Sequence, residues 1–256
     1  MSPVSSDTAH LLQGRVAIVT GSASGIGQQI AVAYAQSGAS VVVADIADGA
    51  QTVEMIRGSG GKAQAIVCDI SLEADTAKLI AFAESAFGGL DILVNNAGIF
   101  PFAPVEATPL ELWNRVFAVN ATGTFLTSKA ALPALRRRGG GKIINVSSGT
   151  FFVGIPAAGA YVASKGAVIG FSRVLAREVG AENIQVNVIT PGLIRTQGVI
   201  DAGMTEEFFG MFRAQQSIPR TGAPDDLAGA ALFLASSLSN FITGQIVNVD
   251  GGLVAH

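Results

Sequence analysis

Seven short runs rich in valine and isoleucine recur along the chain, and they constrain its fold more than any other feature. The runs lack the polar–apolar alternation of strands that have one face in water. They therefore predict strands that are covered on both faces, as in a parallel sheet. The expected strands lie at 15–20, 40–45, 63–68, 91–96, 141–147, 183–190 and 245–250.

Longer segments with helical patterns separate these runs. Thr108, Pro109 and Glu111 mark one helix start, as a cap, a first-turn proline and a capping-box glutamate. Regular alternation of strands and helices predicts right-handed crossovers, and hence an α/β fold with a doubly wound sheet in a single domain. The expected helices lie near 25–37, 48–58, 72–87, 109–137, 156–180 and 224–236.

The composition excludes several classes of partner and location. A net charge of −3 gives no electrostatic footprint for nucleic acid or an anionic membrane surface. The single cysteine, Cys68, cannot form an internal disulfide, which fits a reducing compartment. We find neither a signal-peptide pattern nor 18 successive apolar residues, so we expect a cytoplasmic protein with a flexible extension at 1–13.

Histidine is nearly absent, and this removes whole mechanisms. The two histidines, His10 and His256, lie near the ends of the chain. A Ser-His-Asp triad or a zinc site would have to recruit one of these ends, so we expect neither, and no metal. If the protein is an enzyme, then Tyr, Lys, Ser, Asp or Glu must carry the protons.

A glycine-rich turn, "TGSASGIG" at 20–27, follows the first expected strand and opens the first helix. Gly21 permits a tight turn, Gly25 lets the backbone approach a phosphate, and Gly27 allows close helix packing. Asp45 ends the second strand, where a carboxylate can bind ribose hydroxyls and repels a 2′-phosphate. This pattern predicts NAD(H) rather than NADP(H), although a methyltransferase that binds S-adenosylmethionine stays open at this point.

Tyr161 and Lys165 stand four residues apart in "YVASK", within a helix that is otherwise small and apolar. Side chains at this spacing share one helix face. Such a pair is often no more than a half-buried tyrosine beside a snorkelling lysine. The alternative is an acid–base device in which the ammonium lowers the pKa of the phenol, which is about 10 in a free tyrosine.

The chain resembles the short-chain dehydrogenase/reductase family through "TGSASGIG", "NNAG" at 95–98, "YVASK" and "TPG" at 190–192. The likeness covers nearly everything from residue 14 to 252. It implies a Rossmann fold with seven parallel strands in the order 3-2-1-4-5-6-7. It also implies an NAD-dependent oxidoreductase with a catalytic tetrad formed by Asn120, Ser148, Tyr161 and Lys165.

The resemblance assigns each member of the tetrad a role. Tyr161 is the general acid/base, and Lys165 is its partner and a clamp on the nicotinamide ribose. Ser148, rather than its neighbour Ser147, orients the substrate, and Asn120 holds a water of the proton relay. The cofactor positions that the motifs imply are Gly21, Ser24, Gly25, Ile26, Gly27, Asp45, Ile46, Asp69, Ile70, Asn96, Ala97, Gly98, Tyr161, Lys165, Pro191, Gly192, Ile194 and Thr196.

Phenylalanines are concentrated in three loops that we expect to converge on the substrate. Two ordinary explanations of these phenylalanines are loop packing and a subunit contact. The functional hypothesis is that they form an aromatic pocket for a ring-bearing substrate. Arg195 and Arg213 could meet an anionic substituent, and 193–215 would form a lid. The residues predicted to line the pocket are Phe100, Phe102, Phe151, Phe152, Phe208, Phe209 and Phe212.

Longer stretches sharpen the resemblance. "TFFVGIPAAGAYVASKGAVIGF" is similar to bacterial pyridoxal 4-dehydrogenases, and "NNAGIFPF" to secondary-alcohol dehydrogenases of the 1-phenylethanol type. The resemblance further implies a homotetramer with contacts through the 109–137 helix and the C-terminal helix and strand. For the function, the alternatives to an NAD-dependent dehydrogenase are an NADPH-linked 3-oxoacyl carrier-protein reductase and a non-catalytic NAD sensor.

Overall fold

All seven expected strands are present and form one parallel sheet in the computed structural model, which describes residues 10–254. The order is β3-β2-β1-β4-β5-β6-β7, so the predicted fold class and strand order are confirmed. The strands are β1 (Val16–Thr20), β2 (Ser40–Asp45), β3 (Lys62–Val67), β4 (Ile92–Asn95), β5 (Gly141–Val146), β6 (Ile184–Pro191) and β7 (Ile246–Val249).

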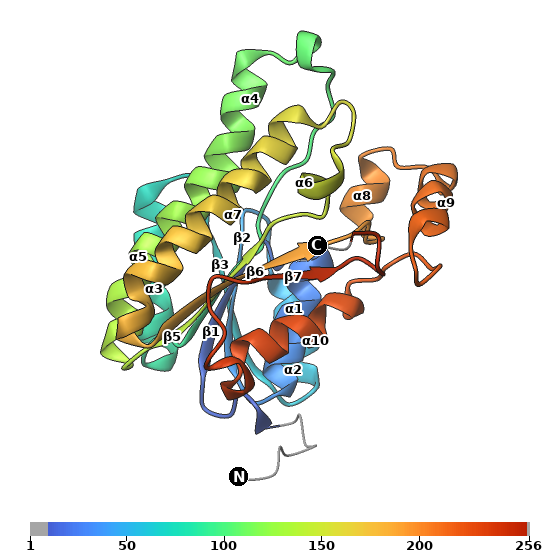
Figure 1. Ribbon diagram of the computed structural model, residues 1–256. Coiled ribbons are helices and arrows are strands. Elements are labelled where there is room, and N and C mark those ends of the chain that lie inside the picture. Colours follow the sequence, from blue (N-terminus) through green and yellow to red (C-terminus); the bar gives the residue numbers. More distant parts are fainter. Residues whose placement is uncertain (1–9, 255–256) are drawn as a thin grey trace.

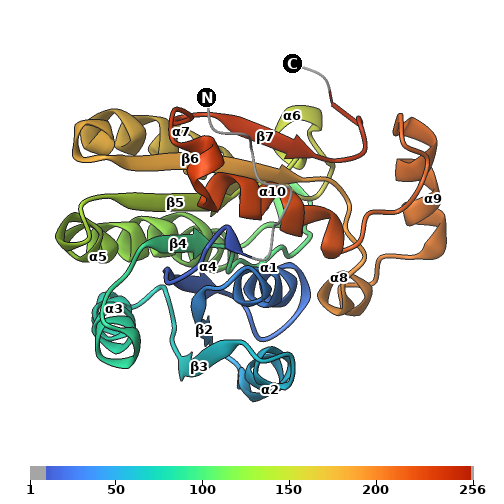
Figure 2. The ribbon, with the colours of Figure 1, turned by 90° about the horizontal axis from the view of Figure 1, so that it is seen from below.

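Helices cover both faces of the sheet, which explains why the five inner strands lack polar alternation (Figures 1 and 2). The expectation of full cover is wrong for β3 and β7, which lie at the two edges and are only partly buried. The layer on one face contains α1 (Gly25–Gln36), α2 (Ala50–Gly58) and α10 (Asp225–Ala235). The layer on the other face contains α3 (Glu73–Phe87), α4 (Leu110–Phe117), α5 (Gly123–Arg137) and α7 (Gly159–Val179). Three short helices lie near the carboxyl edge of the sheet: α6 (Thr150–Val153), α8 (Gln197–Asp201) and α9 (Glu206–Gln215).

The expected helix at 109–137 is interrupted. A π-helical turn, Ala118–Thr122, separates α4 from α5 and carries Asn120. The proposed cap at Thr108 is wrong, because its hydroxyl donates to the carbonyls of Ala103 and Pro104 and caps no helical N–H. A π-bulge inside a helix often marks a functional position, because the extra residue redirects a side chain.

The N-terminal prediction falls partly outside the described residues, since 1–9 are not described. Leu12 is fully buried, and its N–H donates to the carbonyl of Ser37. The packed part of the chain therefore begins before residue 14. Between residues 10 and 254, no helix is both long and apolar enough to cross a lipid bilayer.

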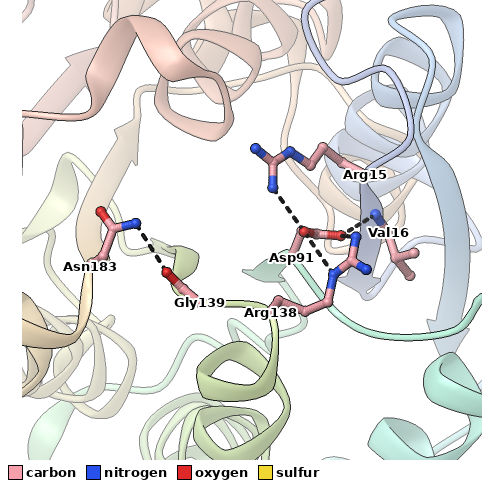
Figure 3. A network of polar contacts seen from close by, with 6 residues as sticks. All are labelled: Arg15, Val16, Asp91, Arg138, Gly139 and Asn183. Carbon is pink, nitrogen blue, oxygen red and sulfur yellow. Dashed lines mark hydrogen bonds and ion pairs between the residues drawn. The ribbon is translucent and has the colours of Figure 1, made fainter.

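The amino edge of the sheet is held together by a buried carboxylate (Figure 3). Asp91, 2% exposed, accepts hydrogen bonds from the N–H of Val16, from Arg15 and from two nitrogens of Arg138. Its backbone also pairs with Val16 and Lys142. One residue thus connects the starts of β1, β4 and β5 with the end of α5.

The only run of basic residues is used for packing within the chain. Arg136 pairs with Glu182, Arg137 with Glu84 and Arg138 with Asp91. Because successive helical residues point about 100° apart, three neighbours reach three different parts of the fold. The run also lies at the end of α5, where the helix dipole favours cations.

Candidate active site

A cleft of about 640 Å³ opens at the carboxyl edge of the sheet, where ligands of doubly wound folds bind. It collects residues that are far apart in the sequence but follow neighbouring strands. All predicted cofactor positions line it except Gly27. The cleft therefore runs from the glycine-rich turn, past β4, to the turn that follows β6.

The glycine-rich turn has the backbone that its sequence predicts. Gly21 and Gly25 have positive φ angles of 65° and 58°, a region that disfavours residues with a side chain. A Cβ on Gly27 would lie 2.2 Å from the carbonyl oxygen of Gly21, so this glycine permits close packing behind the turn. Ser24 and Gly25 line the cleft at the start of α1, where unpaired N–H groups and the helix dipole favour a phosphate.

Asp45 lies beside this turn at the end of β2. Its carboxylate accepts hydrogen bonds from the N–H groups of Ala23 (2.9 Å) and Ala47 (3.0 Å), so it also shapes the turn. Asp69, at the end of the next strand, accepts from the backbone and hydroxyl of Ser71. Among the residues that the structure describes, the cleft lining has only two cations, Arg115 and Lys165.

The predicted tetrad comes together at the middle of the cleft. Tyr161 and Lys165 extend from α7, with the Lys165 ammonium 5.8 Å from the centre of the phenol ring. Lys165 is buried, and its Nζ donates to the carbonyl of Val146 (2.8 Å). Ser148 follows β5 and faces the same cavity. Ser147 is instead bound to the backbone carbonyl of Lys165, which agrees with the choice of Ser148.

The fourth member, Asn120, is buried behind the cleft rather than in its wall. Its side chain accepts from the N–H of Ile99 (2.8 Å) and donates to the Ile99 carbonyl (2.9 Å) and to Ser164 (3.0 Å). Three of its four hydrogen-bonding positions are therefore used. The Asn120 side chain fastens the loop after β4 to the catalytic helix.

The titration of the Tyr161–Lys165 pair differs from the sequence-based hypothesis. Burial raises the pKa of Tyr161 above its ordinary value, and a hydrogen bond with Ser148 acts in the opposite direction. Burial lowers the pKa of Lys165 to about 8. The hydrogen bond with Ser148 is therefore the contact that lowers the pKa of Tyr161, while the Lys165 ammonium donates to the Val146 carbonyl.

The phenylalanine-rich loops converge only in part. Phe100, Phe102, Phe208 and Phe212 line the cleft, and Phe100 packs edge-to-face against Tyr161. Phe209 does not, since it is turned about 100° from Phe208 on α9 and is buried. Phe151 and Phe152 pack against each other on α6, outside the lining.

The two arginines proposed for an anionic substituent lie outside the cleft lining. Arg195 pairs with Glu206 at 2.6 Å and lies 4.1 Å from the ring centre of Phe209. Arg213 donates to the hydroxyl of Thr221. Both therefore fasten α9 to the neighbouring loops.

Sequence reasoning did not identify several residues of the lining. Their signal in the sequence was weak, because most are single apolar residues that belong to no motif. In the described part of the chain, no group of three or more His, Cys, Asp or Glu side chains is placed to hold a metal ion. The missed lining residues include Arg115, Thr150, Val153, Ile155, Leu193, Gly198, Val199, Met204 and Leu253.

A glycine-rich turn, an acid after β2 and a Tyr–Lys pair, gathered at one edge of a seven-stranded parallel sheet, define the class of nicotinamide-dependent oxidoreductases. Comparison with known proteins agrees. The profile of a family described as enoyl-(acyl carrier protein) reductase matches residues 21–254. The chain belongs to the short-chain dehydrogenase/reductase family and is an oxidoreductase that acts on CH–OH groups.

Individual relatives show the range of the family. The chain is 40% identical to cis-4-hydroxycyclohexanecarboxylate dehydrogenase of Sinomonas cyclohexanicum, over 94% of this chain and 97% of the relative. It is 37% identical to D-beta-hydroxybutyrate dehydrogenase of Cupriavidus necator, over 96% and 100%. A crystal structure from Agrobacterium tumefaciens, provisionally named 2-deoxy-D-gluconate 3-dehydrogenase and holding NADP, superposes with a TM-score of 0.90 at 35% identity, covering 98% of this chain and all of that one.

Proposed function

We propose that the protein is an NAD(H)-dependent dehydrogenase that interconverts a ring-bearing alcohol and its carbonyl compound. The observation that carries the proposal is the juxtaposition in one cleft of Tyr161 and Ser148 with apolar rings. An acid–base pair provides the chemistry, and the rings provide a surface that favours a flat or cyclic apolar substrate.

The residues of the cleft fit a dinucleotide. The turn at Gly21 and Gly25 leaves room for backbone to approach a diphosphate, and Asp45 stands where an adenosine ribose would lie. Gly98 fits as well, because a Cβ there would lie 3.3 Å from Nζ of Lys165 and would narrow the approach to it. NAD supplies the hydride acceptor in oxidation and the hydride donor in reduction.

The side chains of this protein handle the proton and the oxygen. In alcohol oxidation the phenolate of Tyr161 accepts the hydroxyl proton, while the hydride leaves the carbinol carbon with its electron pair. Ser148 donates a hydrogen bond to the developing alkoxide. Lys165 would hold the nicotinamide ribose, and the positive charge of its ammonium favours the phenolate of Tyr161.

Asp45 supports the preference for NAD(H). A carboxylate accepts hydrogen bonds from ribose hydroxyls and repels a 2′-phosphate. Neither 22–24 nor 46–47 contains an arginine or lysine that would compensate for this repulsion. The Agrobacterium tumefaciens relative with bound NADP shows that this fold also accepts the phosphorylated cofactor, so the acid, not the fold, carries the proposal.

The substrate we propose is uncharged around the reacting carbon and carries a ring. The lining contributed by residues 97–102 and by residues 198–212 is apolar, with Phe100, Met204 and Phe208. The relative from Sinomonas cyclohexanicum is named for a cyclic alcohol, which supports a ring. Pyridoxal-like and 1-phenylethanol-like alcohols are the specific candidates from the sequence.

We further propose that 193–215, with α8 and α9, closes over the substrate as a lid, and that the protein assembles as a homotetramer. The lid segment lines the cleft through Val199, Met204 and Phe208. Exposed apolar side chains support the assembly: Trp113 and Phe125 on α4 and α5, and Phe233 on α10. Size-exclusion chromatography with light scattering tests the assembly.

The test of the proposed function is NADH absorbance across a panel of cyclic, aryl and pyridine alcohols and the corresponding ketones and aldehydes, with linear hydroxy acids for comparison. We expect turnover of ring-bearing substrates and a smaller kcat/KM for the linear acids. Preference for NADPH with 3-oxoacyl thioesters would favour the carrier-protein reductase instead. NADH binding without turnover of any substrate would favour the sensor.

A further inference from the structure

A second hydroxyl lies directly behind Ser148. The hydroxyl of Thr150, the first residue of α6, donates to Oγ of Ser148 at 2.9 Å. The backbone N–H of Thr150 donates to the same oxygen at 3.2 Å. Thr150 also lines the cleft, so the contact lies beside the reacting groups rather than in the core.

These two contacts determine what Ser148 can do with its own proton. A hydroxyl oxygen has two acceptor positions and one proton. Thr150 occupies both acceptor positions of Ser148, so that its proton is left for Tyr161 or for a substrate oxygen. The influence of Ser148 on its neighbour has the matching sign, because its hydrogen bond lowers the pKa of Tyr161 against the effect of burial.

The backbone around the pair keeps this arrangement in place. The N–H of Gly149 donates to the carbonyl of Pro191 at 2.9 Å, which ties the turn after β5 to the end of β6. Ser148 is only 6% exposed, which leaves little room for water at its hydroxyl beside Thr150. Hydrogen bonds in series also polarise one another, which makes a donor that is itself an acceptor stronger.

We propose that Thr150 is a positioning residue of the reaction: its hydroxyl fixes Ser148 as a hydrogen-bond donor toward Tyr161 and the developing alkoxide. This inference rests on the proposed function. With both acceptor positions occupied, Ser148 acts only as a hydrogen-bond donor. In the oxidation direction the substrate's hydroxyl proton therefore goes to Tyr161 and not to Ser148.

The test compares Thr150→Val, which keeps the shape and the backbone N–H but removes the hydroxyl, with Thr150→Ser, which keeps the hydroxyl. One neutral hydrogen bond corresponds to about a three- to tenfold change. We expect Thr150→Val to lower kcat by about that factor with KM and the NADH dissociation constant unchanged, and Thr150→Ser to restore most of it. Thermal melting of each variant checks that the fold is intact.

A double-mutant cycle with Ser148→Ala distinguishes positioning from direct contact with the substrate. If Thr150 acts through Ser148, adding Thr150→Val to Ser148→Ala leaves the residual kcat unchanged. The same loss in both backgrounds, or wild-type kcat for Thr150→Val alone, would overturn this inference while the dehydrogenase activity stands. Absence of turnover by the wild-type protein would overturn the proposed function, and this inference with it.

Discussion

The two edges of the sheet use polar side chains in opposite ways. At the amino edge, buried Asp91 is surrounded by Arg15, Arg138 and a backbone N–H, and its oxygens serve packing. At the carboxyl edge, Tyr161 and Ser148 line an open cleft, with part of their bonding capacity free. The first arrangement stabilises the fold, whereas the second keeps hydrogen bonds available for a ligand.

Helix direction explains why the edges differ. In a parallel sheet with helical crossovers, each crossover helix begins at the carboxyl edge and ends at the amino edge, as α1 and α5 do. The positive ends of helix dipoles therefore lie beside the cleft, and the negative ends lie beside the arginines of the opposite edge. The same strands thus carry an anion-binding edge and a charge-paired edge.

The largest effect expected at the carboxyl edge comes from Tyr161→Phe. Loss of the acid–base group should lower kcat by about 10²- to 10⁴-fold, with NADH binding and melting temperature nearly unchanged. The other tyrosine of the chain provides a matched control. Tyr34→Phe removes a buried hydrogen bond to the carbonyl of Ala231, and should cost about 1 kcal/mol of stability but leave kcat intact. Wild-type turnover by Tyr161→Phe would refute the assigned acid–base role.

At the amino edge, Asp91→Ala should do the reverse. Removing one partner leaves Arg15 and Arg138 without their shared carboxylate and the Val16 N–H unpaired, at a cost of about 3 kcal/mol in the free energy of unfolding. Urea unfolding measures this loss, and kcat below the transition should match the wild type. Glu178→Ala, at an exposed position, should stay within about 0.5 kcal/mol. A decrease in kcat without loss of stability would mean that the two edges are coupled.

Lys142 adds a pH dependence at the amino edge. Its ammonium is buried against Ser239 and Asn240, and burial lowers its pKa from 10.5 to about 8. Between about pH 8 and 10.5 the unfolded chain therefore binds more protons at this lysine than the folded chain does. The free energy of unfolding should rise with pH across this range, and the gain should be lost as the pH falls again. Lys142→Met should reduce the rise in unfolding free energy with pH by about 2 kcal/mol. Part of the rise should remain, because burial also lowers the pKa of Lys165. Parallel curves for wild type and variant would contradict the prediction.

The smallest effect expected concerns cofactor choice. Asp45→Asn keeps an oxygen for the N–H groups of Ala23 and Ala47 but removes the charge. The ratio of kcat/KM for NADH over NADPH should fall by about tenfold, because repulsion of a 2′-phosphate is lost. Asp69→Asn, at the end of the next strand, is the matched control and should leave the ratio nearly constant. An unchanged ratio in Asp45→Asn would remove the basis for the NAD assignment.

Much of the fold and part of the site followed from local sequence. The valine and isoleucine runs predicted the seven strands, and five of them are covered on both faces; β3 and β7, at the two edges of the sheet, are only partly buried. The turn at Gly21 and Gly25 followed from residue type, because a positive φ angle favours glycine. The prediction for Thr108 failed because a hydroxyl can satisfy a nearby carbonyl as easily as a helical N–H.

By itself, the sequence determined the elements, their alternation and the residue types that the chemistry requires, because these depend on neighbours along the chain. The tertiary structure alone decided which phenylalanines reach the cleft, that Phe209 turns inward, and that Lys165 bonds to Val146 in the protein alone. It also decided that Asp91 joins three strands and that Thr150 lies behind Ser148. These outcomes depend on helix phase and on contacts between distant segments, which packing fixes only when the whole chain is folded.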